Sequence, residues 1–211
     1  MQFTTECIVL SRRNFAEADR LVTLYSKEYG KITVIAKGVR RPKSRKTGHL
    51  EPGTWCVAHI VKGKNLDILT EVIAKKSFGL DNINNEKTVQ IYHFLEILNS
   101  LTPQNQKNEQ SFRILLAFLD KTEKEENFNL LSTIFKIRLL RALGFFAPES
   151  VKKENVKKIL KLLESESIGQ IKKNQKITEQ SYLNLLIFLD SIIEGISESK
   201  LKTKRFLNGP F

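Results

Sequence analysis

Apolar and polar residues alternate over short runs in the first third of the chain. Five runs rich in β-branched and aromatic residues are broken by glycine, proline and charge, at residues 3–10, 21–25, 31–36, 54–61 and 66–73. A period of two places one face of each run in a core, so each run predicts a β-strand. Residues 62–65 join the last two runs, and Gly63 is available there for a positive φ. The pattern predicts a small five-stranded barrel.

The period changes near residue 85, from where apolar residues recur every three or four positions. This is the spacing of the buried face of an α-helix. It predicts helices at residues 89–98, 112–119, 128–139, 156–163 and 182–196. Gly144 and Pro148 follow the third segment in the order that marks the end of a helix.

The two patterns together predict an α+β protein with two domains. Residues 1–80 are expected to form an OB-fold β-barrel, and residues 81–211 an all-α helical domain. The stretch 81–85, which is rich in asparagine, is the expected joint. No internal repeat is visible.

Charge adds a candidate ligand to this picture. The chain has 211 residues, a formal net charge of +12 and a pI of about 9.7. Residues 1–80 hold 15 Lys/Arg and 7 Asp/Glu, a net of +8, so two-thirds of the excess lies in the barrel. Such an excess favours a polyanionic partner, and OB-folds commonly bind single-stranded nucleic acid. The alternative is a protein that is basic throughout without a specific partner.

The excess is concentrated further in residues 36–46, which contain no acid. Gly38 and Pro42 predict a surface loop after the third strand. Six neighbouring cations repel one another unless an anion neutralises them, and such a loop can follow phosphates while arginine also stacks on bases. We therefore predict that the nucleic-acid contacts are Lys37, Arg40, Arg41, Lys43, Arg45 and Lys46. The alternative is a solvated basic loop.

Aromatic residues of the barrel are candidates for base stacking, although most aromatics on alternating strands belong to a core. Trp55 and Tyr29 are favoured because each adjoins a turn. The full set is Phe3, Phe15, Tyr25, Tyr29, Trp55 and Phe78.

The sequence offers no catalytic constellation, so we expect a protein that is not an enzyme and binds no cofactor. Cys56 and His59 have half of a metal-site spacing, but residues three apart on a strand point to opposite faces. The pattern Gly30-Lys31-Ile32-Thr33 lacks the first glycine of a phosphate-binding loop.

Cellular location follows from what the chain lacks. Two cysteines make no disulfide framework, the first ten residues lack a signal-peptide layout, and the apolar stretches are too short to span a bilayer. We expect a cytoplasmic, reduced protein.

Residues 8–53 resemble the N-terminal domain of the RecO family. The likeness rests on Val9-Leu10, Glu17, Asp19-Arg20, Gly30-Lys31, Ala36-Lys37-Gly38, the basic segment and Gly48-x-Leu50-x-Pro52. Residues 135–148 and 200–207 are similar to the helix that ends in Leu-Gly-aromatic and to the C-terminal segment of the same family. The likeness thus touches both predicted domains.

The resemblance implies a mediator of DNA repair and recombination, associated with the nucleoid. It implies binding of single- and double-stranded DNA, annealing of complementary strands, and work with RecR, in some systems with RecF, to help RecA replace single-strand-binding protein. It carries the DNA contacts onto the six cations above. It also implies docking of the acidic, aromatic-ended tail of single-strand-binding protein near Lys136, Arg138 and Arg141.

One departure from the family is the metal. Many relatives carry a four-cysteine zinc module after the Leu-Gly-aromatic-Pro stretch, whereas no cysteine follows Pro148 here. We therefore expect no zinc. The chain is also short, which affects the docking sites for partners more than DNA binding.

Three other functions stay open from the sequence. An OB-fold module could bind RNA, since basic loops do not distinguish ribose from deoxyribose. Glu17 and Asp19 would be the carboxylates of a metal-dependent nuclease, although their place beside Arg20 favours local salt bridges. The helical part could serve only as a scaffold for protein contacts.

Overall fold

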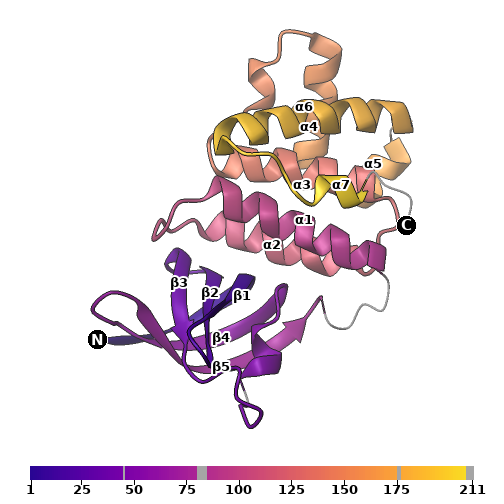
Figure 1. Ribbon diagram of the computed structural model, residues 1–211. Coiled ribbons are helices and arrows are strands. Elements are labelled where there is room, and N and C mark those ends of the chain that lie inside the picture. Colours follow the sequence, from indigo (N-terminus) through magenta and orange to yellow (C-terminus); the bar gives the residue numbers. More distant parts are fainter. Residues whose placement is uncertain (45, 80–84, 175–176, 208–211) are drawn as a thin grey trace.

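The computed structural model describes the whole chain except residues 45, 80–84, 175–176 and 208–211, and consists of a β-barrel with a stack of helices on one side (Figure 1). The five strands are β1 (Gln2–Phe15), β2 (Asp19–Ser26), β3 (Gly30–Ala36), β4 (Thr54–Val61) and β5 (Asp67–Ser77). A short 3₁₀ helix, η1 (Thr47–Leu50), precedes β4. The predicted strands and the α+β class are confirmed.

The barrel closes in the order β1-β2-β3-β5-β4, with β4 pairing back onto β1. Neighbours are antiparallel except β3 and β5, which are parallel and meet at Val34 and Ile35. Each strand thus has a neighbour on both sides, although β3 and β5 meet over only two residue pairs, and the inward residues fill one apolar core. The alternation read from the sequence is visible in β4, whose residues are buried at every second position.

The β4–β5 connection differs from its prediction in one respect. Gly63 is not among the glycines with positive φ. A glycine is required at this position because the backbone approaches closely: a Cβ there would lie 1.9 Å from the carbonyl oxygen of Leu66. The Asp67 carboxylate holds the same loop by accepting a hydrogen bond from the Gly63 amide and by pairing with Lys62 at 2.7 Å.

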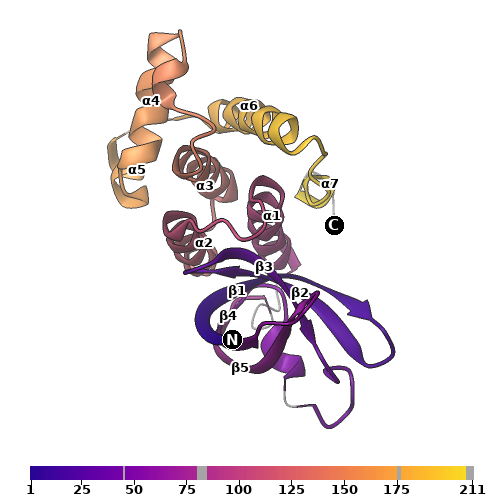
Figure 2. The ribbon, with the colours of Figure 1, turned by 90° about the vertical axis from the view of Figure 1, so that its left-hand side faces the viewer.

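The helices form layers above the barrel (Figures 1 and 2). They are α1 (Asn85–Leu101), α2 (Glu109–Thr122), α3 (Phe128–Ala142), α4 (Glu154–Ser165), α5 (Ile168–Asn174), α6 (Glu179–Ser197) and α7 (Lys204–Leu207), with a 3₁₀ turn, η2 (Pro148–Ser150). The five predicted helices are present, and α5 and α7 are additional. Helix α3 ends as predicted, because Gly144 adopts a φ of +77° and the Phe145 amide bonds the Leu140 carbonyl at 2.9 Å.

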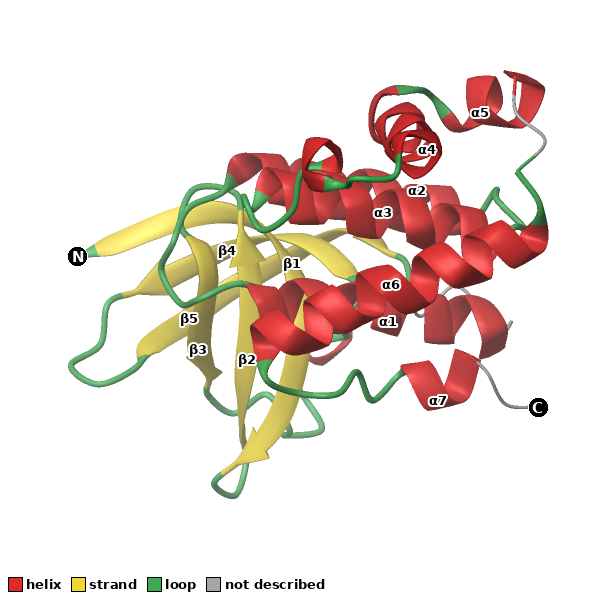
Figure 3. Ribbon diagram, turned by 90° about the horizontal axis from the view of Figure 1, so that it is seen from above, coloured by secondary structure: helices red, strands yellow, loops and turns green. Residues whose placement is uncertain are grey.

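Helices α1 and α2 lie directly on the barrel, and α3 and then α6 lie above them (Figures 2 and 3). The helical core continues into the barrel wall through Ile8, Leu10 and Tyr25. Lys31 reinforces the contact by donating to the Asn99 carbonyl at 2.6 Å. Of the predicted joint at 81–85, residues 81–84 lie outside the described residues, and Asn85 is the first residue of α1. No helix in the described part of the chain has the length and apolar character needed to cross a membrane.

Candidate nucleic-acid interface

The basic segment follows β3 as a series of turns, and its backbone is fixed from inside the barrel. Val39 is fully buried in the barrel core, and its carbonyl accepts a hydrogen bond from the Thr47 hydroxyl at 2.6 Å. Lys37, Arg41 and Lys43 are exposed on either side of this anchor. The segment is therefore an anchored loop with outward cations. Arg45 lies outside the described residues.

Arg40 joins the segment to the tip of the β1–β2 hairpin. Its guanidinium donates to the Glu17 carbonyl at 2.9 Å, and its amide donates to the Ala18 carbonyl at 2.9 Å. The Gly38 amide donates to the Asp19 carboxylate at 2.7 Å. Two elements that are separate in sequence thus form one surface.

On its other side the segment lies over β5. Lys46 donates to the Thr70 carbonyl at 3.3 Å and lies at 3.5 Å from that of Leu69. Together the loop and the strand enclose an open groove of about 700 Å³. Its lining includes four of the predicted cations, His49, the acid Glu71 and the apolar Val72 and Ile73; the cations are Lys37, Arg41, Lys43 and Lys46.

None of the five described cations of the segment forms an ion pair with a carboxylate in the described part of the chain. Other barrel lysines are used differently. Lys62 pairs with Asp67, Lys75 pairs with Glu6, and Lys76 reaches the helices by pairing with Asp120 at 2.9 Å. The charge of the segment is therefore available to a ligand, while much of the remaining barrel charge is neutralised.

The structure adds arginines that the sequence analysis missed. Arg12 and Arg13 lie on the C-terminal part of β1, opposite Val22 and Leu21 of β2, and Arg20 is the next residue along β2, opposite Asn14. Burial lowers the pKa of Arg20, and the nearby guanidiniums of Arg12 and Arg40 lower it further, against the opposing effect of Glu51. Glu51 pairs directly with Arg12. Arg13 is the exposed member of this group, and through it the positive surface continues from the segment along the hairpin. The adjacent pair Arg12-Arg13 was the available sequence signal.

The barrel aromatics divide sharply by exposure. Tyr25 and Phe78 are buried in the core shared with the helices. The Trp55 ring packs against that core and carries the Lys75 ammonium 4.7 Å from its centroid. Phe3 and Tyr29 stack on each other at 4.4 Å between centroids. Phe15, which the sequence did not favour, stands open at the hairpin tip.

No group of three or more metal-ligating side chains comes together among the described residues. Cys56 is buried, whereas His59 is on the outer face and contacts the Thr4 hydroxyl at 2.7 Å, so the expected opposite placement is confirmed. Cys7 and Cys56 face each other as free thiols at 3.5 Å. Their mutual hydrogen bond and burial raise the pKa of Cys7 well above its usual value, which makes a poor nucleophile.

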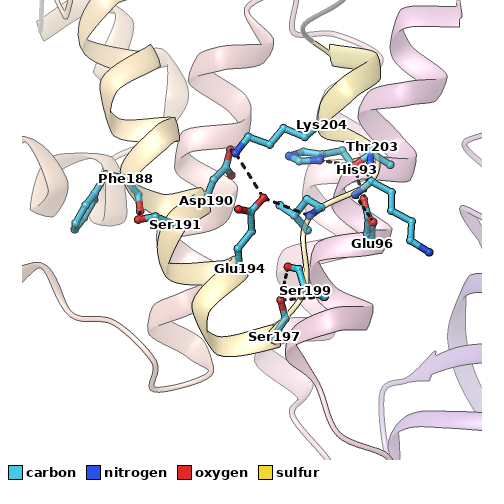
Figure 4. A network of polar contacts seen from close by, with 12 residues as sticks. His93, Glu96, Phe188, Asp190, Ser191, Glu194, Ser197, Ser199, Thr203 and Lys204 are labelled. Carbon is cyan, nitrogen blue, oxygen red and sulfur yellow. Dashed lines mark hydrogen bonds and ion pairs between the residues drawn. The ribbon is translucent and has the colours of Figure 1, made fainter.

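The three residues expected to dock a partner do not form a continuous exposed basic face on α3. Lys136 is buried between α3 and α6, where its ammonium pairs with Asp190 at 2.6 Å. Figure 4 shows the surrounding network, in which Lys204 also pairs with Asp190 and Thr203 contacts His93 at 2.8 Å. Glu96 of α1 accepts hydrogen bonds from the backbone amides of Lys202 and Thr203, in the C-terminal segment that contains Lys204. The network fastens that segment to α1 and α6.

The other two residues of this set are nearer the surface. Arg138 is half-buried and donates to the Glu166 carbonyl at 2.5 Å. Arg141 keeps 45% of its side chain exposed and pairs with Glu149 at 3.1 Å and Glu164 at 3.4 Å. These contacts belong to the unbound protein, and docking at this helix stays a prediction.

Comparison with known sequences gives one consistent family. Residues 1–78 match the family "Recombination protein O N terminal", and residues 86–150 match "Recombination protein O C terminal". The chain is 32% identical over 146 residues to DNA repair protein RecO of Acetivibrio thermocellus, covering 67% of this chain and 57% of the relative. It is 29% identical over 143 residues to the protein of the same name from Pelotomaculum thermopropionicum, covering 68% and 56%.

A third relative, from Roseiflexus, is 31% identical over 143 residues, which cover 68% of this chain and 50% of that protein. The chain thus spans about half the length of the curated relatives that it matches. The first family match contains the whole basic segment, and the second contains α2, α3 and all of α1 except its first residue.

Proposed function

The chain belongs to the RecO family, and on that premise we propose that it is a non-enzymatic mediator of DNA repair and recombination. It binds single- and double-stranded DNA through the basic segment, anneals complementary strands, and helps RecA load onto DNA coated by single-strand-binding protein, together with RecR. Residues 1–80 carry the DNA interface and residues 81–211 carry partner docking and further DNA contacts.

One observation carries the proposal: the described cations of the basic segment are not neutralised within the protein. Four of them line a groove beside the barrel while Arg40 contacts the β1–β2 hairpin, and the backbone that holds them is fixed by Val39 and by that hairpin. A binding surface that is already ordered loses less entropy when a ligand binds. Because phosphate contacts are independent of sequence, this surface suits any DNA strand.

Annealing needs no bond to be broken. Two single strands repel each other through their phosphates, and the barrier falls where a protein cation is shared between them. Arg13, which is exposed on the hairpin, extends the positive surface beyond the segment, whereas Arg12 is paired with Glu51 and Arg20 is partly buried. This extension supports contact with a second strand while the first lies along the groove.

The test is a charge reversal that spares the fold. Lys37→Glu, Arg41→Glu and Lys43→Glu change exposed side chains, whereas Arg40 and Lys46 hold carbonyl groups and are left alone. Each phosphate contact to a single strand contributes about 0.7 to the slope of log K against log salt, so losing three lowers the slope by about 2. If wild type and variant bind equally at about 1 M salt, where the electrostatic contribution is small, this difference in slope makes the variant about 100-fold weaker at about 0.1 M salt.

The matched control is Lys152→Glu, Lys153→Glu and Lys158→Glu, which makes the same change in net charge at exposed lysines around α4. This triple variant should keep the wild-type slope. Strand annealing with complementary oligonucleotides, with and without single-strand-binding protein, should fail only in the first triple variant. Equal losses in both variants, or none in the first, would refute the basic segment as the DNA interface.

The same experiment separates the rival functions. Tighter binding to RNA of matched sequence would indicate an RNA-binding module instead. Strand cleavage with added magnesium or manganese that disappears in a Glu17→Gln variant would indicate a nuclease. For the helical part, we propose that the tail of single-strand-binding protein docks at α3 near Lys136, Arg138 and Arg141, where Arg141 is the most accessible of the three.

A further inference from the structure

Phe15 stands at the tip of the β1–β2 hairpin with an open ring. It is the last residue of β1, opposite Asp19, and 41% of it is exposed. The next residue, Ala16, turns the chain with a φ of +49°. In the part of the chain that the structure describes, no aromatic or cationic side chain covers this ring.

An exposed phenylalanine on its own needs no explanation. What distinguishes this one is its attachment to the basic segment. The carbonyl of Glu17, two residues on, accepts from the Arg40 guanidinium, and the Ala18 carbonyl accepts from the Arg40 amide. The Asp19 carboxylate, directly opposite Phe15, accepts from the Gly38 amide. The hairpin tip and the cations therefore keep a fixed relation to each other.

The rings of the other barrel aromatics are at least partly covered by other side chains. Tyr29 is comparably exposed, but its ring is stacked on Phe3, and the neighbouring charges include Glu28. Trp55 is half-buried against the helical core with Lys75 over its ring. Phe15 is thus the aromatic that combines an open face with neighbouring cations, which include the exposed Arg13.

This combination matches the chemistry of a single strand. Its bases present π-faces that stack on aromatic side chains, while its phosphates follow a positive groove. In a duplex the base faces are already stacked inside the helix, so an open aromatic ring gains little there. A ring beside cations therefore discriminates between the two forms of DNA, which the cations alone do not.

We propose that Phe15 is a base-stacking residue and that the hairpin tip gives the interface its preference for single-stranded DNA. The proposal rests on the proposed DNA-binding function and adds to it the contact that distinguishes single strands from duplex. One unpaired base stacks on the ring while the flanking phosphates contact the segment and Arg13. Stacking involves no ion release, so it contributes affinity that does not depend on salt.

The experiment measures binding of the full chain to an oligothymidine and to a duplex of the same length. Phe15→Ala should weaken binding to the single strand by about 5-fold to 100-fold, the range measured for loss of one stacked base. Binding to the duplex should change by less than about 2-fold, and the salt slope should stay that of the wild type. A 2-aminopurine base in the single strand should be quenched by the wild type and less so by the variant.

Two further variants at this position separate stacking from mere apolar contact. Phe15→Trp keeps a π-face and should retain the single-strand affinity, whereas Phe15→Leu keeps apolar volume without a ring and should behave as Phe15→Ala. Tyr29→Ala, which removes an equally exposed aromatic from the β2–β3 turn, is the matched control and should bind as the wild type does.

The outcomes also distinguish this proposal from the function on which it rests. Wild-type protein that binds no DNA would overturn the proposed function itself. Wild-type binding that is lost in the Lys37, Arg41 and Lys43 variant but kept in Phe15→Ala would overturn only the stacking site. Equal losses on single strand and duplex, or full activity of Phe15→Leu, would equally contradict stacking.

Discussion

The buried ion pair between α3 and α6 gives a sharp prediction about stability. The Lys136 and Asp190 side chains are 2% and 6% exposed, and 2.6 Å separates the ammonium nitrogen from the carboxylate oxygen. We expect Asp190→Ala to destabilise the fold severely, because it leaves a charged lysine inside the protein without its partner. Lys204, which also contacts Asp190, is itself a cation and adds like charge near Lys136 once the carboxylate is removed.

The magnitude follows from the geometry. At an effective dielectric constant near 20, two unit charges about 2.6 Å apart attract by about 6 kcal/mol, which is offset in part by the cost of desolvating both groups. Removing one partner of a buried pair typically costs about 3–5 kcal/mol. A domain is stable by only about 5–15 kcal/mol, so the variant should be close to unfolding at 37 °C.

The loss should shrink at alkaline pH. Burial lowers the pKa of Lys136 from its ordinary value of 10.5, and Asp190 opposes this effect. Without Asp190 the pKa falls further. Between the lowered folded pKa and the unfolded value the unfolded chain binds more protons, so the free energy of unfolding rises with pH. Asp190→Ala should therefore regain stability more steeply than the wild type as the pH rises toward 10.5, the ordinary pKa of lysine.

Urea denaturation followed by circular dichroism measures both effects. The double variant Lys136→Met, Asp190→Leu removes both charges at similar volume and should lie within about 1 kcal/mol of the wild type or above it. Lys204→Ala, which removes a partly exposed cation from the same carboxylate, should cost less than about 1 kcal/mol. An Asp190→Ala variant that loses less than about 1 kcal/mol, or a double variant as unstable as the single one, would refute the reasoning.

Two other predictions concern the same fold. Burial, followed by the nearby Lys136 ammonium, lowers the pKa of His93 well below 6.5, so the unfolded state alone takes up a proton as the pH falls. The free energy of unfolding should drop by about 1.4 kcal/mol per pH unit below 6.5, a slope that His93→Gln should remove in urea titrations at pH 5 to 7. Gly30 has a φ of +70°, and a Cβ there would lie 1.9 Å from the Gln106 carbonyl oxygen. Gly30→Ala should cost about 3 kcal/mol or more, whereas Gly144→Ala, with equal strain and open space, should cost only about 1–2 kcal/mol in thermal melts.

The barrel was predictable because each strand has one face in the core, so its alternation is written into the sequence. The C-terminal extension of β1 was not predictable in this way. A bulge between Val9 and Ser11 shifts the register and breaks the alternation, so the strand continues to Phe15 where the pattern had stopped at residue 10. The missed extension is the part of β1 that carries Arg12 and Arg13.

Helices α5 and α7 escaped prediction for a different reason. Each is too short to show two turns of apolar periodicity, and α7 is held by contacts that are distant in sequence. Lys204 at its start pairs with Asp190 and Glu194 of α6. Such contacts exist only once the tertiary structure has formed.

The candidate site was predictable where its residues are contiguous. Six cations in one loop stay together however the loop folds, whereas Arg20 joins them only through the pairing of β1 with β2 and the return of the segment. Lys136 illustrates the opposite case. From the sequence, a lysine within an apolar helix is expected to lie on the exposed face of that helix. That Lys136 is buried becomes clear only from its contact with Asp190, which is 54 residues later in the chain.

The charges of this protein follow two patterns that imply two uses. In the fold, charged side chains are held: Lys136 by Asp190, Lys76 by Asp120, and Arg12 by Glu51. In the basic segment the backbone is held and most side chains are left to the solvent, with Val39 buried as the anchor. Mutual repulsion among unpaired cations costs stability at every moment that no anion is bound. The backbone contacts keep the loop folded despite this repulsion. Phosphates that bind to the cations then remove the repulsion.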